Sequence, residues 1–342
     1  MMRASKRVRL GVVGLGRIGG LHADNLAGRV SSVELVRVVD IEPELARAAG
    51  ERLGVDWSTS YEDLLSDPRI DGVAIATPTP THAAMVEQAA AASKHVFCEK
   101  PISFDLPSAE RALAAARAAG IAFQVGFQRR FDPEHAAAAA RIAAGELGEV
   151  YLFRTTLRDM RPPAIDYIRG SGGFFVDVTI HDLDAARWLV GEVEEVTAFG
   201  AVLSDPAFAE VGDVDNAVVA LRFASGALGA IDGSRVAGYG YESSTEVVGS
   251  RATVRIGGHR RLRSVWLTPG SAAVDWVADF TERYRDAYVL ELEEFAAAIR
   301  EGREPAVTGE DGLAAFVLAR ACERSFREGR TVRVVQEPAE VA

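Results

Sequence analysis

A glycine-rich turn that directly follows a short apolar run is the feature that most constrains the fold of this chain. The run is Val8–Val13, and the turn reads Gly14-Leu15-Gly16-Arg17-Ile18-Gly19 before a helical pattern begins. In a strand-turn-helix unit the first glycine allows a tight turn, the second lets the backbone approach a pyrophosphate, and the third permits close helix packing. The pattern predicts a dinucleotide-binding unit with phosphates at the helix N-terminus, formed by Gly14, Gly16, Arg17, Ile18 and Gly19.

A second apolar run, Val33–Val39, ends in Asp40, about 20 residues beyond the third glycine. An acidic residue at this distance is expected to bind the ribose 2′-hydroxyl of NAD. Ile41 and Glu42 follow without an adjacent arginine, so the 2′-phosphate of NADP would be repelled. We therefore predict NAD as the cofactor, and the alternative is a glycine turn that binds no ligand.

Strand and helix patterns alternate through the first third of the chain. Further expected elements are a helix over 43–53, a strand at 55–57, a helix over 61–65, a strand at 72–76, a helix over 81–92, a strand at 95–98, a helix over 106–119 and a strand at 121–125. Such alternation predicts an α/β fold with a doubly wound parallel Rossmann sheet. Ligands of these sheets bind outside the carboxyl ends of the strands.

Two of these strand ends carry residues suited to a ligand. Thr77-Pro78-Thr79-Pro80-Thr81-His82 is rigid and rich in hydroxyls, and it suits a nicotinamide or ribose. His82 is either part of that lining or the first turn of a surface helix. Lys100, in Glu99-Lys100-Pro101, is either a solvated rim charge or an ammonium donor to a substrate oxygen.

The pattern changes after Phe127. Long strand-like runs are expected at 150–157, 193–202, 217–223, 227–235, 242–249 and 252–256, with helices over 133–144, 283–300 and 312–327. Turns such as Ala224-Ser225-Gly226 between the runs predict a large, mainly antiparallel open sheet in a C-terminal α+β domain. We expect an NAD-binding Rossmann domain over 1–126 and a substrate-binding and oligomerisation domain over 127–342. An uncovered sheet face favours a homo-oligomer, a tetramer or dimer.

The stretch that begins Gly170-Ser171-Gly172-Gly173 leads into an apolar run with a carboxylate and an imidazole, Asp177 and His181. If this segment is helical, residues i and i+4 share a face, so the two can work as a pair. A histidine oriented by a carboxylate accepts a proton near neutral pH. The alternative is a core histidine on a helix whose apolar stripe is Ile180, Leu183, Trp188 and Leu189. With two domains, the cleft between them is the expected site.

The composition limits the kinds of binding partner to be expected. The formal net charge of −11 gives no electrostatic support for binding nucleic acid or an anionic membrane, so a small-molecule substrate is expected. The basic start, residues 1–9, runs at once into the glycine turn instead of a signal-sequence core, and no apolar run could span a bilayer. Cys98 and Cys322 have no metal-ligand spacing and suit a reducing cytoplasm. We expect no metal.

Segments along nearly the whole chain resemble the glucose-fructose oxidoreductase / inositol dehydrogenase (Gfo/Idh/MocA) family, and within it the inositol 2-dehydrogenases. The similar segments, in addition to those above, are Val125-Gly126-Phe127-Gln128-Arg129-Arg130-Phe131-Asp132, Pro162-Pro163-Ala164-Ile165-Asp166-Tyr167-Ile168, Val211-Gly212-Asp213-Val214-Asp215-Asn216-Ala217 and Tyr239-Gly240-Tyr241-Glu242.

The resemblance implies roles for individual residues. Lys100, Asp177 and His181 take the catalytic positions, and the peptide bond before Pro101 is expected to be cis. Polyol-binding positions are implied for Arg129, Asp159, Tyr241 and Tyr284, together with the catalytic three. Cofactor contacts are implied or expected for Thr77, Pro78, His82, Glu99 and Gln128. Gln128 departs from several inositol dehydrogenases, which carry methionine or asparagine there, and this leaves the exact polyol open.

The resemblance implies an NAD-dependent dehydrogenase that oxidises a ring secondary alcohol of a cyclitol, myo-inositol to 2-keto-myo-inositol (scyllo-inosose) being the foremost candidate. Another cyclitol or an aldose, or NAD-dependent glycoside cleavage, are alternatives within the family. A non-catalytic NAD-binding transcriptional sensor is a further alternative. The presence of Lys100, Asp177 and His181, and the absence of a basic helix in the sequence, argue against the sensor.

Overall fold

The computed structural model describes residues 7–257, 261 and 265–334, so the first six residues of the basic start lie outside the described part. The chain forms two compact units. The first unit comprises residues within Met1–Phe131 and Asp286–Leu313, and the second those within Asp132–Arg285 and Ala314–Glu340. A late segment thus returns to the first unit, which the contiguous division at residue 126 does not include. That division stays a prediction about where the functions lie.

The first unit contains the predicted parallel sheet, with strand order β3-β2-β1-β4-β5-β6. All of its strand pairs are parallel. The strands are β1 (Val8–Val13), β2 (Val33–Val39), β3 (Asp56–Ser58), β4 (Gly72–Ile75), β5 (His95–Glu99) and β6 (Phe123–Gly126). This is the doubly wound Rossmann order, which confirms the fold predicted from the alternating pattern.

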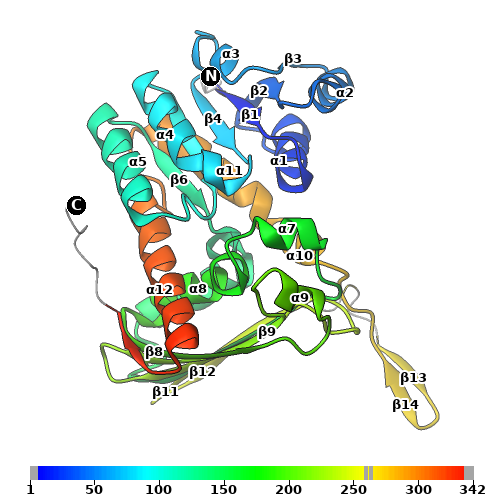
Figure 1. Cartoon of the computed structure of the whole chain (residues 1–342), viewed down its shortest axis with the longest axis vertical. Helices are drawn as coiled ribbons and strands as arrows, with labels where there is room; N and C mark the ends of the chain where they lie inside the picture. The colour runs from blue at the N-terminus through cyan, green and yellow to red at the C-terminus, as the bar shows by residue number, and fades with distance from the viewer. Residues whose placement is uncertain (1–6, 258–260, 262–264, 335–342) are drawn as a thin grey trace, which may run out of the picture. The chain divides into compact units, whose positions relative to one another are not determined.

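Local sequence signals bound some of the helices of the first unit. They are α1 (Arg17–Gly28), α2 (Pro43–Leu53), α3 (Glu62–Leu65), α4 (His82–Ala91), α5 (Leu106–Ala119) and α11 (Ala287–Glu301). In α5, the Asp105 carboxylate accepts the N–H of Ser108 at 2.9 Å, and Gly120 ends the helix at a φ of +63°. Helices α4 and α5 pack side by side (Figure 1).

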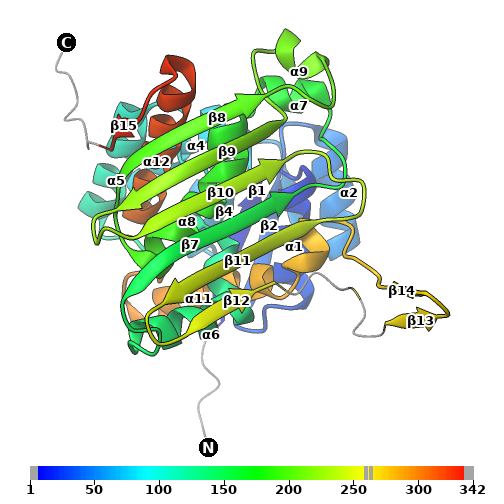
Figure 2. The ribbon, with the colours of Figure 1, turned by 90° about the horizontal axis from the view of Figure 1, so that it is seen from below.

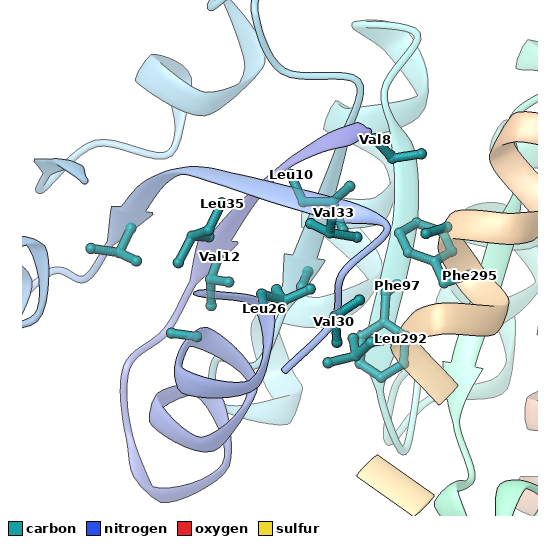
Figure 3. Packing of buried hydrophobic residues seen from close by; sticks show 14 of the residues in the cluster. Val8, Leu10, Val12, Leu26, Val30, Val33, Leu35, Phe97, Leu292 and Phe295 are labelled. Atoms are coloured by element: carbon teal, nitrogen blue, oxygen red, sulfur yellow. The ribbon is translucent and has the colours of Figure 1, made fainter. Parts of the chain in front are cut away.

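The helix α11 belongs to the first unit because its apolar face completes that unit's core. Leu292 and Phe295 are fully buried in a cluster with residues of β1, β2 and α1 (Figure 3). The ring of Phe295 lies 6.1 Å from that of Phe97 in β5, centroid to centroid. Burial of two large apolar side chains fixes a segment that lies far away in the sequence.

The second unit is built on a seven-stranded sheet with order β12-β11-β7-β10-β9-β8-β15. The strands are β7 (Val150–Arg158), β8 (Val193–Ala201), β9 (Asn216–Phe223), β10 (Leu228–Ser234), β11 (Glu242–Gly249), β12 (Thr253–Ile256) and β15 (Val332–Arg333). The sheet is mostly antiparallel, as predicted, but β10 pairs with β7 in parallel. The pair β13 (Trp266–Thr268) and β14 (Ser271–Ala273) forms a separate hairpin that the sequence patterns did not indicate.

Helices cover one face of this large sheet, and no helix of the described residues covers the other (Figure 2). The helices of the unit are α6 (Pro133–Ala143), α7 (Ile165–Arg169), α8 (Ile180–Val190), α9 (Ala207–Glu210), α10 (Phe280–Arg283) and α12 (Gly309–Glu328), the last of these from Ala314 onward. Helix α8 packs on β7 and helix α6 on β12. No helix of the described residues has the length and apolar character needed to cross a membrane.

The predicted helix around Asp177 is present, with one irregularity. Residues Phe175–Thr179 form a widened π-helical turn (η3), and the regular helix α8 starts at Ile180. A π-turn holds more residues than a regular turn, so the i, i+4 argument does not transfer directly to Asp177 and His181. Ile180, Leu183 and Leu189 are buried as expected, whereas Trp188 is half-buried.

Candidate active site

The glycine turn of the first unit has the local geometry that the motif predicts. Gly14 has a φ of +84°, and a Cβ on it would lie 2.7 Å from the backbone of Ala76 and Thr77. A Cβ on Gly19 would lie 1.8 Å from the carbonyl oxygen of Gly14. A Cβ on Gly16 would meet no atom of the described residues within 4 Å. Packing therefore requires glycine at two positions but leaves Gly16 to be explained by a ligand.

The N-terminus of α1 is open to an anion. Gly16 occupies the cap position, and no side chain among the described residues caps the helix there. Arg17 is exposed and Ile18 half-buried in the first turn. The first N–H groups of a helix carry partial positive charge, so this turn fits the pyrophosphate of a dinucleotide.

Asp40 follows β2 at the carboxyl edge of the sheet and is buried. Its Oδ2 accepts the N–H of Leu15 at 2.6 Å, and its Oδ1 accepts the N–H of Glu42 at 2.9 Å. The carboxylate thus ties the end of β2 to the glycine turn. Each oxygen has a second lone pair, so the same group can also accept a ribose hydroxyl, as the sequence predicts.

His82 is a buried bridge in the structure. It is 1% exposed, with Nδ1 2.8 Å from the carbonyl oxygen of Pro101 and Nε2 2.7 Å from that of Thr77. Burial lowers the pKa of His82, and the two carbonyls oppose that shift. A neutral imidazole has one N–H, so it donates to one of these two carbonyls while the buried ring lies against both the Thr77 and the Lys100-Pro101 segments, a role that neither sequence interpretation included. Thr77 itself is half-buried and Pro78 is exposed.

The segment Glu99-Lys100-Pro101 ends β5, and the peptide bond between Lys100 and Pro101 is cis, as the resemblance implies. Glu99 and Lys100 are both half-buried. The N–H of Lys100 points to Oε2 of Glu99 at 3.3 Å, while Oε1 of Glu99 lies 2.8 Å from Nε2 of His22. Glu99 therefore contacts both the backbone of Lys100 and the imidazole of His22.

Gln128 and Arg129 lie in the short turn that follows β6, in η2 (Gln128–Phe131). They are 5% and 2% exposed, respectively. The turn packs against α11. Arg130, which also lies in this turn, pairs with Asp311 at 3.0 Å. All the first-unit residues of the predicted site thus follow the carboxyl ends of the parallel strands.

In the second unit, the strand register brings three groups to one end of the sheet. Ser234, the last residue of β10, is opposite Arg158, the last residue of β7, and Arg158 is opposite Glu242 at the start of β11. Asp159, Arg235 and Tyr241 are the residues next to these ends. The N–H of Asp159 donates to the carbonyl of Ser234 at 3.0 Å.

Asp177 is held by two partners at this end of the sheet. Its Oδ2 accepts from Nη1 of Arg235 at 3.1 Å, and its Oδ1 accepts from the hydroxyl of Tyr167 at 2.9 Å. Arg235 is 1% exposed, its Nη2 lies 3.7 Å from Oδ2 of Asp213, and its guanidinium stacks over the ring of Phe174 at 5.4 Å. A guanidinium presents several N–H donors in a fixed fork, so Arg235 can serve both carboxylates.

His181 lies in the first turn of α8, just after the π-turn that carries Asp177, and is half-buried. The structure thus places the predicted carboxylate and imidazole in adjoining turns of one continuous helical segment. Their direct pairing stays a prediction. A π-turn at this position is consistent with a functional site, where such irregularities are common.

The two tyrosines of the predicted polyol set are both buried. Tyr241 is 4% exposed, and its ring meets that of Tyr284 edge-on, with centroids 6.4 Å apart. Tyr284 is fully buried, and its hydroxyl donates to Oγ of Ser243 at 2.7 Å. Tyr284 therefore supports Tyr241, and its hydroxyl proton is already used.

Three residues at this site were missed from the sequence: Arg235, Asp213 and Tyr167. Asp213 and Tyr167 lie in segments that resemble the family, but the resemblance implies no role for either residue. Arg235 had one usable signal, since it is a charged residue that follows the apolar strand β10. Its carboxylate partner Asp177 is 58 residues away in the chain, so no local pattern could connect the two.

The turn at Gly14–Gly19, the open end of α1 and Asp40 define a Rossmann-type dinucleotide-binding protein. The description "oxidoreductase family, NAD-binding Rossmann fold" matches residues 8–127, and "oxidoreductase family, C-terminal alpha/beta domain" matches residues 139–334. The chain belongs to this family, Gfo/Idh/MocA, and is an NAD-dependent oxidoreductase.

Several relatives and solved structures resemble nearly the whole chain. A myo-inositol 2-dehydrogenase of Thermotoga maritima is 43% identical, covering 96% of this chain and 98% of the relative. A scyllo-inositol 2-dehydrogenase (NAD(+)) of Bacillus subtilis is 39% identical, covering 96% of each. The crystal structure of a scyllo-inositol dehydrogenase from Lactobacillus casei, with bound NAD(H) and scyllo-inositol, is 28% identical with a TM-score of 0.91, covering 96% of this chain and 99% of that one.

Proposed function

We propose that this chain oxidises a ring secondary alcohol of an inositol with NAD, and that myo-inositol, giving 2-keto-myo-inositol, is its foremost substrate. The observation that carries the proposal is the likeness over 96% of the chain to relatives that act on inositols. Scyllo-inositol is the second candidate, because relatives named for it match over the same length.

The residues of the first unit fit NAD. Gly14, Gly16 and Gly19 shape the turn, the open N-terminus of α1 suits the pyrophosphate, and the Asp40 carboxylate suits the ribose hydroxyls. When bound, NAD supplies an acceptor for the hydride of the alcohol carbon. Thr77, Pro78, Glu99 and Gln128 are proposed to line the same site, with His82 holding the lining in place.

Side chains of the protein accept the proton of the alcohol. His181 accepts it, because a neutral imidazole is a base near neutral pH. Asp177, which is paired with Arg235, orients that imidazole and stabilises its cationic form. Lys100 donates a hydrogen bond to the oxygen on which negative charge develops. Lys100 is the alternative immediate base for this proton.

Polyol hydroxyls need several hydrogen-bonding partners to be told apart. We propose Arg129, Asp159 and Tyr241 for this task, with Lys100, Asp177 and His181 at the reacting carbon. Tyr284 acts through the ring of Tyr241, because its own hydroxyl donates to Ser243.

The test is the absorbance of NADH when the purified protein meets NAD and, separately, myo-inositol, scyllo-inositol, D-chiro-inositol, glucose and xylose. NADH formation with an inositol, well above that with the aldoses, supports the proposal and ranks the isomers. NADH formation with glucose or xylose alone overturns it. NAD binding without NADH from any of the five favours NAD-dependent glycoside cleavage, in which the cofactor is regenerated within each turnover, or a sensor instead.

A homo-oligomer is proposed on the uncovered face of the large sheet. Across the strands, Leu152 is opposite Leu228, and Phe199 is opposite Val218, and these four side chains are 46% to 69% exposed. Apolar side chains gathered on a flat sheet face are typical of an interface between copies. Sedimentation of wild type and of Phe199→Glu tests this, with dissociation expected for the variant and an unchanged mass contradicting the choice of face.

A cytoplasmic location is proposed from the two cysteines. Cys98 and Cys322 are both free thiols that are buried in the structure, and neither is positioned for a metal or disulfide framework. Fractionation of cells that carry a tagged chain tests this, since recovery in the periplasmic or extracellular fraction would contradict it.

A further inference from the structure

A cluster of three titratable side chains lies buried behind the Lys100 segment, entirely within the first unit. His22 comes from α1, Glu99 from the end of β5 and Glu291 from α11. One nitrogen or oxygen atom of each lies within 4.8 Å of the others. His22 and Glu291 are fully buried, and the side chain of Glu99 is 13% exposed.

His22 and Glu99 are directly hydrogen-bonded. Nε2 of His22 lies 2.8 Å from Oε1 of Glu99, and because a carboxylate only accepts, the imidazole nitrogen donates. The rings of Phe97 and Tyr288 meet the imidazole edge-on, at centroid distances of 5.1 and 5.8 Å. The pair is therefore fixed in an apolar surrounding.

Glu291 is the unusual member of the cluster. It is 0% exposed, and neither of its carboxylate oxygens has a hydrogen-bond partner among the described residues. An ionised carboxylate without hydrogen bonds, beside a second carboxylate, is strongly disfavoured inside a protein. Burial raises the pKa of Glu291 well above its ordinary range, and the negative charge of Glu99 raises it further.

Glu99 connects this cluster to the lysine. Its Oε2 accepts the backbone N–H of Lys100 at 3.3 Å. A Cβ on Gly126 of the neighbouring strand would lie 3.2 Å from three atoms of the Glu99 carboxylate, so β6 leaves little room for that carboxylate to move. A change in charge at Glu291 would thus act on a group that is packed against the backbone of Lys100.

We propose that His22, Glu99 and Glu291 form a buried proton-holding site in which Glu291 remains a neutral carboxylic acid at neutral pH, while Glu99, hydrogen-bonded to His22, positions Lys100. The positioning of Lys100 as a reacting group rests on the proposed function. The protonation state of Glu291 does not.

The other titratable and charged groups near the cluster are few. His82 of α4 responds to the charges of both Glu99 and Lys100, and the Cys98 thiol, fully buried in β5, responds to Glu99. Gln124 of β6 is neutral and donates to the backbone carbonyl of Glu291 at 2.8 Å. Tyr288 of α11 contributes its ring against His22. None of these contacts gives the Glu291 carboxylate a cation to pair with.

The proposal predicts a pH dependence of stability with a definite sign. Glu291 binds its proton more tightly in the folded than in the unfolded chain, so the folded state loses stability as pH rises above the ordinary value of about 4.5. Glu291→Gln keeps the shape of the neutral acid and removes the titration. The variant and the wild type should melt at similar temperatures near pH 5, and the variant should melt increasingly higher towards about pH 8.

The matched control is Glu301→Gln, at the exposed end of the same helix, where the carboxylate pairs with Arg303 at the surface. Its melting temperature should follow the wild type at every pH, because exposed ion pairs contribute little. A Glu291→Gln variant that melts lower than wild type at neutral pH, with the control unchanged, overturns the proposal, since the carboxylate would then be needed in its ionised form.

Two further readouts separate proton holding from other roles. The infrared C=O band of a buried, protonated carboxylic acid should be present in the wild type at neutral pH and absent from Glu291→Gln. One equivalent of a divalent metal that survives dialysis in wild type and is lost in Glu291→Gln would overturn the proposal, because a metal requires an ionised ligand. Neither readout depends on turnover, so they hold even if no inositol is oxidised.

Where inositol oxidation is observed, the ratio of kcat for Glu291→Gln to kcat for wild type should rise with pH, because only the wild type loses the positioning of Lys100 when Glu291 ionises. A ratio that stays constant while the melting-temperature difference grows would retain the proton-holding site and remove its link to Lys100.

Discussion

The two units hold their proposed functional residues by different means. In the first unit the backbone does most of the work: a glycine turn, the open N-terminus of α1 and the carboxyl ends of parallel strands provide the cofactor site. In the second unit side chains do it, because the buried Arg235 gathers Asp177 and Asp213 at the end of a sheet. Backbone sites depend on local sequence, whereas side-chain networks depend on distant residues meeting.

The largest expected effect falls on the second unit's part of the site. His181→Ala should lower kcat by about 10²- to 10⁴-fold, the usual contribution of a positioned general base. The affinity for NAD should stay within a few-fold of wild type, because the proposed NAD contacts lie in the first unit. Steady-state kinetics with inositol and NAD binding followed by fluorescence check both expectations. Comparable turnover in the variant would refute the role of His181.

Arg235→Met removes the cation from the side-chain network of the second unit. The substitution leaves the Asp177 and Asp213 carboxylates buried without their guanidinium, and breaking a buried ion pair lowers the free energy of unfolding by about 3–5 kcal/mol. Arg235→Lys should recover part of this, since it restores the charge but not the planar fork.

Urea denaturation measures the change, and Arg154→Met is the control because the side chain of Arg154 is 65% exposed and pairs with Glu246 at 3.3 Å. Equal destabilisation by Arg235→Met and Arg154→Met would mean that the buried network contributes nothing particular.

Gly19→Ala tests the backbone part of the site in the first unit. The new Cβ would lie 1.8 Å from the carbonyl oxygen of Gly14, so the turn must move, at a typical overpacking cost of about 1–3 kcal/mol. NAD affinity should fall by at least about 10-fold by the same free-energy scale.

The neighbouring Gly20→Ala is the matched control for this change, since its Cβ would come no closer than 3.7 Å to another atom. Calorimetric titration with NAD compares the two variants. Equal NAD affinity in both would contradict the account of the glycine turn.

The smallest expected effect is that of Tyr167→Phe, which removes the hydrogen bond from the Tyr167 hydroxyl to Asp177 while leaving Arg235 in place. Tyr167 is 54% exposed, so the loss should be about 1 kcal/mol, or roughly a 5-fold fall in kcat. Tyr151→Phe, at a similarly exposed tyrosine on β7, provides the control. A fall of kcat as large as that for His181→Ala would make Tyr167 a principal partner of the reaction and not an accessory to Asp177.

The sequence predicted the first unit well because its signals are local. The glycine spacing, Asp40 at the end of β2 and the strand-helix alternation are each readable within a few tens of residues, and the structure confirms the turn geometry and the parallel sheet. The position of α11 in the first unit could not be predicted, because an apolar helix face can pack against either core. Only the packing of Leu292 and Phe295 on β5 and its neighbours determines it.

The second unit was predicted in outline and missed in detail. The apolar runs and the turns between them predict the open, mostly antiparallel sheet. They do not predict the parallel pairing of β7 with β10, because β8 and β9 lie between these two strands in the chain. That pairing is what brings Asp159 and Arg235 to one edge. The π-turn at Phe175–Thr179 has no composition signal, so regular i, i+4 spacing was expected there instead.

We propose that Lys100 of the first unit and His181 of the second act on the same alcohol. A double-mutant cycle on kcat, with Lys100→Met, His181→Gln and the two combined, tests it most directly. The double variant should be no slower than the slower single variant, because each change already disables one shared step. Losses that multiply fully in the double variant would show two independent contributions and contradict a joint role in the transfer.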